Sequence, residues 1–102
     1  MRAAPLLLPL ALAATAAGCG GGGDSVAAHQ RYLWVQTCAE CHAIAPGRRS
    51  PDVAAANLSD AHPSREAVRR SVIDGRPGMP KGLLGGDDVD SIAAYVVART
   101  KR

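Results

Sequence analysis

The sequence predicts an all-α domain, with three main helices over 26–38, 64–74 and 87–100 that are joined by long loops. Two patterns predict this: residues recur in each segment at the three- and four-residue spacing of one helix face, and helix-end signals flank the second and third segments. A third observation concerns size. With no Phe, one Trp and two Tyr among 102 residues, so small a chain is expected to need a staple or a prosthetic group in its core.

The first two helices are predicted from spacing and from end signals. Four residues at helical spacing define the first: Ala27, Gln30, Trp34 and Cys38. The second is predicted to begin at Ser64, a residue that suits an N-cap, and to end at Gly75, which suits the position just past a helix. One face of this second helix consists of Ala67, Val68, Ser71 and Val72.

The third helix is predicted from an acidic start and an apolar stripe. Negative charge favours a helix N-terminus through capping and the helix dipole, and the residues that provide it are Asp87, Asp88 and Asp90. The stripe follows the i, i+3, i+4, i+7 spacing of a helix packed on one side, and it consists of Val89, Ile92, Ala93 and Val96.

Residues 1–18 are predicted to be a signal peptide of the lipoprotein type. Met1 and Arg2 form a short positive start, and an Ala- and Leu-rich stretch follows that Pro5 and Pro9 interrupt. That stretch is too short and too interrupted for a membrane-spanning helix, so export is the better interpretation.

The residues Ala16-Ala17-Gly18-Cys19 resemble the lipobox of bacterial lipoproteins, in which the cysteine is lipidated and becomes the new N-terminus. Ala16 stands where these proteins usually have Leu. Residues 19–25 would then be a lipidated cysteine and a flexible glycine-rich tether, which holds a domain at 26–102 on the extracytoplasmic side of a membrane, at the periplasmic face or cell envelope. The alternative is ordinary cleavage nearby, with Cys19 left as a free thiol.

The charge distribution argues against a nucleic-acid partner. The formal net charge is +3, and the basic residues are scattered, with adjacent pairs at Arg48-Arg49, Arg69-Arg70 and Lys101-Arg102. A nucleic-acid-binding surface needs a clustered basic stripe, often with interleaved aromatic residues, and the sequence has none.

The central motif is Cys38-Ala39-Glu40-Cys41-His42, a C-x-x-C-H pattern. Two thiols at this spacing can each add across a vinyl group of one porphyrin, and the histidine that follows at once can bring an imidazole nitrogen to the iron. The pattern therefore predicts one covalently attached haem c, bound through Cys38 and Cys41 with His42 as an axial ligand.

Three other interpretations of this motif remain open. A thioredoxin-like redox pair requires a βαβ context, which the sequence lacks. A zinc site requires about four ligands, and the other histidines, His29 and His62, are isolated. A Cys38–Cys41 disulfide, in a lipoprotein without haem, closes too short a loop to restrict the unfolded chain by much.

Met79 is the predicted sixth ligand of the iron. It lies 37 residues after His42 within Gly75–Pro80, where prolines and glycines exclude regular helix or strand. Such a loop suits the presentation of a thioether sulfur to the other face of a haem, and His/Met ligation is typical of electron transfer at a raised reduction potential. The alternative is a surface turn with an incidental methionine.

With both ligands in place, the chain is similar to class I bacterial cytochromes c of the monohaem type over about residues 26–101. The family has an aromatic residue four positions before the first cysteine, matched by Trp34, and one in the C-terminal helix, matched by Tyr95. These two residues are expected to pack near one another in the core. Gln30 stands where the family often has a small Gly, which suggests a wider or shifted crossing of the terminal helices.

The resemblance also implies a partner for the second nitrogen of His42, namely the backbone carbonyl of a proline. Pro51 is the best match, because Pro51-Asp52-Val53 resembles the family's Gly-Pro-x-Leu, and Pro46 is the alternative. Arg48 is a candidate to neutralise a haem propionate, although a solvated loop position explains it equally well.

The function that the resemblance implies is one-electron transfer between redox proteins, such as respiratory or dehydrogenase complexes. Holding the iron in six-coordination leaves no open position, so neither an enzymatic activity nor a small-molecule substrate is expected. The alternative is a sensor or enzyme with five-coordinate haem, in which Met79 is not a ligand.

Overall fold

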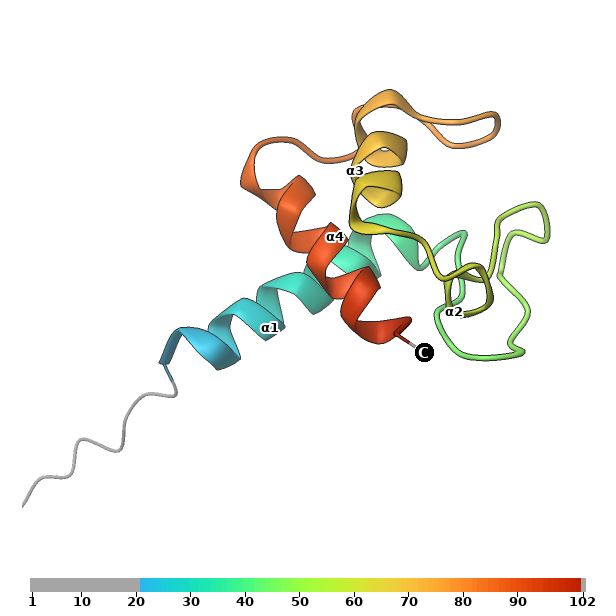
Figure 1. Ribbon diagram of the computed structural model, residues 1–102. Coiled ribbons are helices and arrows are strands. Elements are labelled where there is room, and N and C mark those ends of the chain that lie inside the picture. The colour runs from blue at the N-terminus through green and yellow to red at the C-terminus, as the bar shows by residue number, and fades with distance from the viewer. Residues whose placement is uncertain (1–20, 102) are drawn as a thin grey trace, which may run out of the picture.

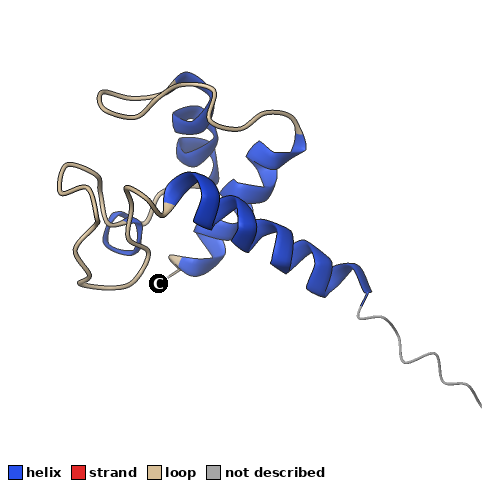
Figure 2. Ribbon diagram, turned by 180° about the vertical axis from the view of Figure 1, so that it is seen from behind, coloured by secondary structure: helices blue, strands red, loops and turns tan. Residues whose placement is uncertain are grey.

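Helices and loops make up the part of the chain that the structure, a computed structural model, describes, which is residues 21–101 (Figures 1 and 2). The elements in chain order are α1 (Gly21–Leu33), a π-helical turn (Trp34–Cys38), α2 (Leu58–Ala61), α3 (Arg65–Asp74) and α4 (Asp87–Arg99). Within this part, strand-like pairing is limited to an isolated bridge between Arg76 and Met79. The predicted all-α fold is therefore confirmed. The signal segment and Cys19 lie outside the described residues.

α4 is the central helix, because it contacts both α1 and α3. Figure 1 shows it crossing the C-terminal half of α1, while the N-terminal half of α1 extends away from the other helices. The loop before α2 and the first part of the 75–86 loop project together from the other side, and Figure 2 shows them on one side again. The fold thus brings the two loops that carry the predicted site residues to the same side of the helices. None of the described helices is long and apolar enough to cross a membrane.

Both ends of α3 follow the sequence signals. The hydroxyl oxygen of Ser64 accepts a hydrogen bond from the backbone N–H of Ala67 at 3.1 Å, which satisfies one of the free donors at the helix start. At the other end the N–H of Gly75 donates to the carbonyl of Ser71 at 2.9 Å. The predicted N-cap and the predicted terminating glycine are both confirmed.

Three helix features differ from the sequence prediction. α1 begins at Gly21 rather than at residue 26, so residues 21–25 are helical and not coil; glycine costs only about 1 kcal/mol per residue in a helix, so a glycine run does not forbid one. α4 has Gly86, with φ +58°, at its N-cap and no side-chain cap, so its aspartates favour the helix start through the dipole rather than by capping. The short helix α2 was not predicted, because four residues are too few to give a periodic pattern.

The core lies where α3 and α4 meet the C-terminal part of α1. Ile92, Val96 and Val72 are almost completely buried, with exposed fractions of 0, 1 and 2%. The rings of Trp34 and Tyr95 lie beside them, tilted by 34° with centroids 6.0 Å apart, within the range of favourable aromatic pairs. The predicted proximity of these two aromatic residues is confirmed.

Gln30 makes a polar contact where the family often has a glycine. Its side-chain amide donates to the backbone carbonyl of Ser91 at 3.2 Å, and the adjacent His29 meets the carboxylate of Asp88 at 2.9 Å. Side chains therefore bridge α1 and α4 at this level.

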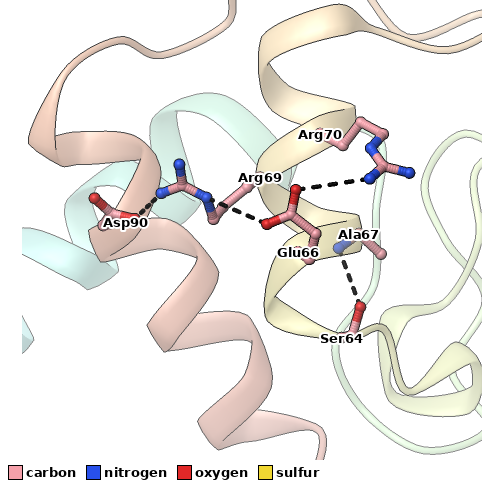
Figure 3. A network of polar contacts seen from close by, with 6 residues as sticks. All are labelled: Ser64, Glu66, Ala67, Arg69, Arg70 and Asp90. Atoms are coloured by element: carbon pink, nitrogen blue, oxygen red, sulfur yellow. Dashed lines mark hydrogen bonds and ion pairs between the residues drawn. The ribbon is translucent and has the colours of Figure 1, made fainter.

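A cluster of exposed ion pairs joins α3 to α4 (Figure 3). Arg69 reaches from α3 to Asp90 on α4 and also lies 3.7 Å from Glu66, which in turn lies 3.7 Å from Arg70. Exposed pairs of this kind each contribute at most about 1 kcal/mol. The apolar core, rather than these charges, therefore dominates the α3–α4 contact.

Replacing Ile92 with Ala is expected to lower the free energy of unfolding by about 2–5 kcal/mol, because it leaves a cavity at the centre of the core. Ile73→Ala is the matched control, since Ile73 is 47% exposed, and its loss should stay near 0.5 kcal/mol. Urea unfolding followed by the fluorescence of Trp34 measures both. Equal losses in the two variants would contradict the assignment of Ile92 to the core.

Candidate functional site

The two cysteines and the histidine of the central motif lie around one backbone carbonyl. The N–H groups of Cys41 and His42 both donate to the carbonyl of Cys38, at 3.1 and 2.9 Å. Cys38 is the last residue of the π-helical turn and is buried, while Cys41 is exposed; both are free thiols. The motif is therefore a tight turn that continues α1, with one sulfur in the core and one at the surface.

The buried sulfur sits in a poor environment for a thiolate. Burial first, and the neighbouring Cys41 second, raise the pKa of the Cys38 thiol to about 11, so it is neutral at neutral pH. Zinc ligands and redox-active cysteines act as thiolates. In addition, no group of three or more His, Cys, Asp or Glu suited to a metal ion occurs among the described residues. A neutral thioether fits this buried position, and the described residues offer no cluster of ligands for zinc around it.

The imidazole of His42 is oriented by a backbone carbonyl. Its Nδ1 lies 2.7 Å from the carbonyl oxygen of Ala56. Since a carbonyl only accepts hydrogen bonds, Nδ1 carries the proton, and Nε2 of the neutral ring has a free lone pair. A hydrogen bond of this kind is how a ligating histidine is usually held with its other nitrogen toward a metal.

The carbonyl that holds His42 belongs to Ala56, so the assignment of Pro51, or alternatively Pro46, to this contact was wrong. The backbone around Pro51 is bound elsewhere: the N–H of Asp52 donates to the carbonyl of Cys41 at 3.2 Å. The family's Gly-Pro-x-Leu position is instead taken by residues 55–58, which read Ala-Ala-Asn-Leu. Because alanines stand in place of both the glycine and the proline, the sequence lacks the two residues by which this contact to the histidine is recognised.

The segment between His42 and α2 is closed by polar contacts that sequence reasoning missed. The buried Ser50 accepts from the N–H of Ala43 at 3.1 Å, and the carbonyl of Ala43 accepts from the N–H of Leu58 at 2.9 Å. Asn57 donates to two further carbonyls of the same loop and caps α2. The signal available for this was an Asn three residues before Asp60, a common pattern at helix starts. The side chain of Arg48 is exposed, and its backbone carbonyl is one of the acceptors.

Met79 is the last residue of a tight turn formed by Arg76-Pro77-Gly78-Met79. Arg76 and Met79 exchange two backbone hydrogen bonds, of 3.0 and 2.7 Å. Gly78 has φ +80°, the value of the third residue of a type II turn, in which proline favours the second position. The turn fixes the backbone of Met79 at the point where the loop reverses.

The base of this methionine loop is fastened to the end of α3. The N–H of Gly82 donates to the carbonyls of Val72 and Ile73, at 3.0 and 3.1 Å, so it covers carbonyls that the helix end leaves free. Gly75 has φ +74° and ψ +178°, a conformation that is essentially restricted to glycine. A Cβ atom at Gly75 would lie 2.8 Å from the carbonyl oxygen of Met79. The loop returns so closely over residue 75 that no side chain fits.

Half-buried apolar side chains from the loops and from two helices pack against the buried core cluster to which Cys38 belongs. They come from the segment after Cys38, from α2 and α3, and from the methionine loop: Ala39, Ile44, Leu58, Val68, Met79, Leu83 and Leu84. Met79 and Cys38 thus contact the same apolar cluster, and the imidazole of His42 is half-buried. The described residues thus offer sulfur, imidazole and partly exposed apolar surface.

A protein-family model described as cytochrome C oxidase, cbb3-type, subunit III matches residues 25–96, from α1 into α4. The chain belongs to this family. Comparisons with curated proteins and with solved structures gave no match. Family membership makes this a c-type cytochrome domain, which binds haem c covalently and functions in electron transfer outside the cytoplasm.

The described residues of this cytochrome c domain fit a haem on three counts. Cys38 and Cys41 are free thiols rather than a disulfide. His42 has Nε2 available because Ala56 engages Nδ1. The partly exposed apolar side chains provide the kind of surface that a flat hydrophobic ring covers.

Replacing Gly75 with Ala is expected to displace the methionine loop, because the new Cβ meets the backbone of Met79 and Lys81. Gly47→Ala is the control: Gly47 has a similar φ of +70° but nothing within 4 Å of an added Cβ. Both variants should lose about 1–2 kcal/mol of stability through backbone strain, and Gly75→Ala should lose about 1–3 kcal/mol more. Trypsin should also cleave after Lys81 faster in Gly75→Ala alone. Equal stability and equal cleavage would contradict the close approach.

Proposed function

We propose that this protein is a monohaem one-electron carrier of the class I type, in which His42 and Met79 are the axial ligands of the haem iron. The observation that carries the proposal is the Cys38-to-His42 turn: two free thiols and an imidazole with an available Nε2 are held around one carbonyl. That is the set of groups that covalent attachment and axial ligation require.

In this proposal each of the four residues has a distinct role. Cys38 and Cys41 form the thioether links, and the burial of Cys38 keeps its sulfur out of water and unavailable to oxidants. His42 ligates through Nε2 while Ala56 fixes the plane of its ring. Met79, on a turn closed by two hydrogen bonds, supplies a neutral sulfur that favours the ferrous state. The bound haem supplies a reversible one-electron change at its iron.

Electron transfer rather than catalysis follows from the two axial ligands, because together they leave no position for a substrate or a gas. Both ligands belong to loops that hydrogen bonds tie back to neighbouring segments, which keeps their movement small when the charge of the iron changes. Arg48 remains a candidate to face a propionate, since its side chain is exposed on the loop that holds His42. We expect exchange with redox proteins of a respiratory chain, in line with the family's description.

We further propose that Cys19 is lipidated after removal of residues 1–18 and that it holds the domain at the extracytoplasmic face of a membrane. The support is the sequence Ala16-Ala17-Gly18-Cys19 at the end of an apolar leader. α1 extends from the body toward this end of the chain (Figure 1). A tether of this kind replaces diffusion through the whole compartment by a search along the membrane.

The haem and its ligands are tested on the full chain, produced in a bacterium that has the haem-attachment machinery. The protein should keep its haem on a denaturing gel, and its oxidised form should show the weak far-red band that a methionine–Fe(III) bond produces. Met79→Leu should lose the band and lower the reduction potential, because it removes the thioether ligand. Leu83→Ala, a packing change in the same loop, should keep the band.

Two results would overturn parts of this proposal. Protein without covalent haem would rule out the carrier. Covalent haem without the far-red band, combined with carbon monoxide binding to the reduced form, would favour the sensor or enzyme with five-coordinate haem.

The tether is tested by growth with a labelled fatty acid. The wild type should incorporate the label and sediment with membranes, whereas Cys19→Ser should do neither but should keep its haem. Label in Cys19→Ser, or none in the wild type, would contradict lipidation at this cysteine.

A further inference from the structure

The side chain of Asn57 makes four hydrogen bonds, two through its amide nitrogen and two through its amide oxygen. Its amide nitrogen donates to the carbonyls of Ala45 and Arg48, at 2.7 and 2.6 Å. Its amide oxygen accepts from the N–H groups of Ser59 and Asp60, at 2.9 and 3.4 Å. This half-buried residue therefore links the loop that follows His42 to the start of α2.

The position of Asn57 also determines where the carbonyl of Ala56 points. That carbonyl lies in the peptide plane that joins residues 56 and 57, and the plane includes the Cα atom of Asn57. The next N–H, of Leu58, is bound to Ala43, the residue after His42. Residues 56–58 are thus pinned to residues 42–48 by four hydrogen bonds, two of which come from the Asn57 amide.

We propose that Asn57 is the positioning residue for His42: its amide holds the peptide whose carbonyl accepts the Nδ1–H hydrogen bond. The inference rests on the proposed function, because it takes His42 as the iron ligand. It goes beyond that function in assigning control of the proposed ligand to a side chain whose hydrogen bonds all go to other residues.

The physical consequence is a tuned reduction potential. A hydrogen bond from Nδ1–H to a carbonyl makes the imidazole a stronger electron donor through Nε2, which favours the ferric state. If the Ala56 carbonyl is released, the imidazole donates less and the reduction potential rises. The Nδ1 proton also loses its protection and exchanges faster with water.

A simple capping role is the competing explanation, because Asn57 also caps α2. Asn57→Ser separates the two roles: a serine oxygen still caps a helix, but it cannot reach the carbonyls of Ala45 and Arg48. Ser64→Ala is the matched control, since it removes the cap of α3, away from the loop that holds His42.

The experiment uses the haem-loaded full chain of each variant. Potentiometry gives the reduction potential, and proton NMR of the reduced form gives the exchange rate of the His42 Nδ1–H. Asn57→Ser should raise the reduction potential. It should also speed exchange of the Nδ1 proton by roughly five- to tenfold, the change expected for one lost hydrogen bond. Ser64→Ala should alter neither quantity.

Four outcomes decide the inference. An unchanged potential and exchange rate in Asn57→Ser overturns it, as do equal shifts in Ser64→Ala. Asn57→Asp is the second variant, similar in size but without the amide donors: faster exchange of the Nδ1 proton supports the inference and an unchanged rate overturns it. These results are separable from the proposed function, because a wild type with His/Met spectra and no response at Asn57 leaves the carrier intact.

Discussion

The structure depends on how its loops satisfy their backbone groups. Buried carbonyls and N–H groups that lack a partner cost free energy comparable to a lost hydrogen bond, and the two long loops of this chain have few large apolar residues to compensate. Each loop therefore closes on a neighbouring segment: residues 56–58 on the residues after His42, and Gly82 on the end of α3. The same bonds that satisfy the backbone also fix the two proposed ligands.

The parts of the fold that depend on helix signals could be predicted from sequence. Ser64 and Gly75 bound α3 as expected, and the stripe from Val89 to Val96 provides the core face of α4. The pairing of Trp34 with Tyr95 also followed from the resemblance. These features could be predicted because a helix repeats its contacts every three or four residues, so that many residues together indicate one helix face.

The predictions that failed concern contacts that a single residue makes with another segment of the chain. Ala56 offers only a backbone carbonyl, which every residue has, so its partnership with His42 left no trace in residue type. Pro51 was assigned to this contact because proline is the recognisable residue of the family pattern. In this chain the residue that makes the contact is an alanine, Ala56. Asn57 had a local signal as a cap, but its bonds to Ala45 and Arg48 depend on how the loop folds back, and no spacing rule encodes that.

The loop closures also bear on how such a small chain can carry electrons. A carrier needs its ligands to keep their places as the iron changes charge, yet most of the fully buried apolar residues here belong to the helices around Ile92. Rigidity at the two proposed ligands must then come from directional contacts: the Ala56 carbonyl at His42, and the turn at Gly78 with the tight passage over Gly75 at Met79. Each of these depends on backbone geometry rather than on side-chain size. A domain with no Phe can therefore bind a large cofactor, because a bound haem would add apolar surface to the core while these backbone contacts fix its proposed ligands.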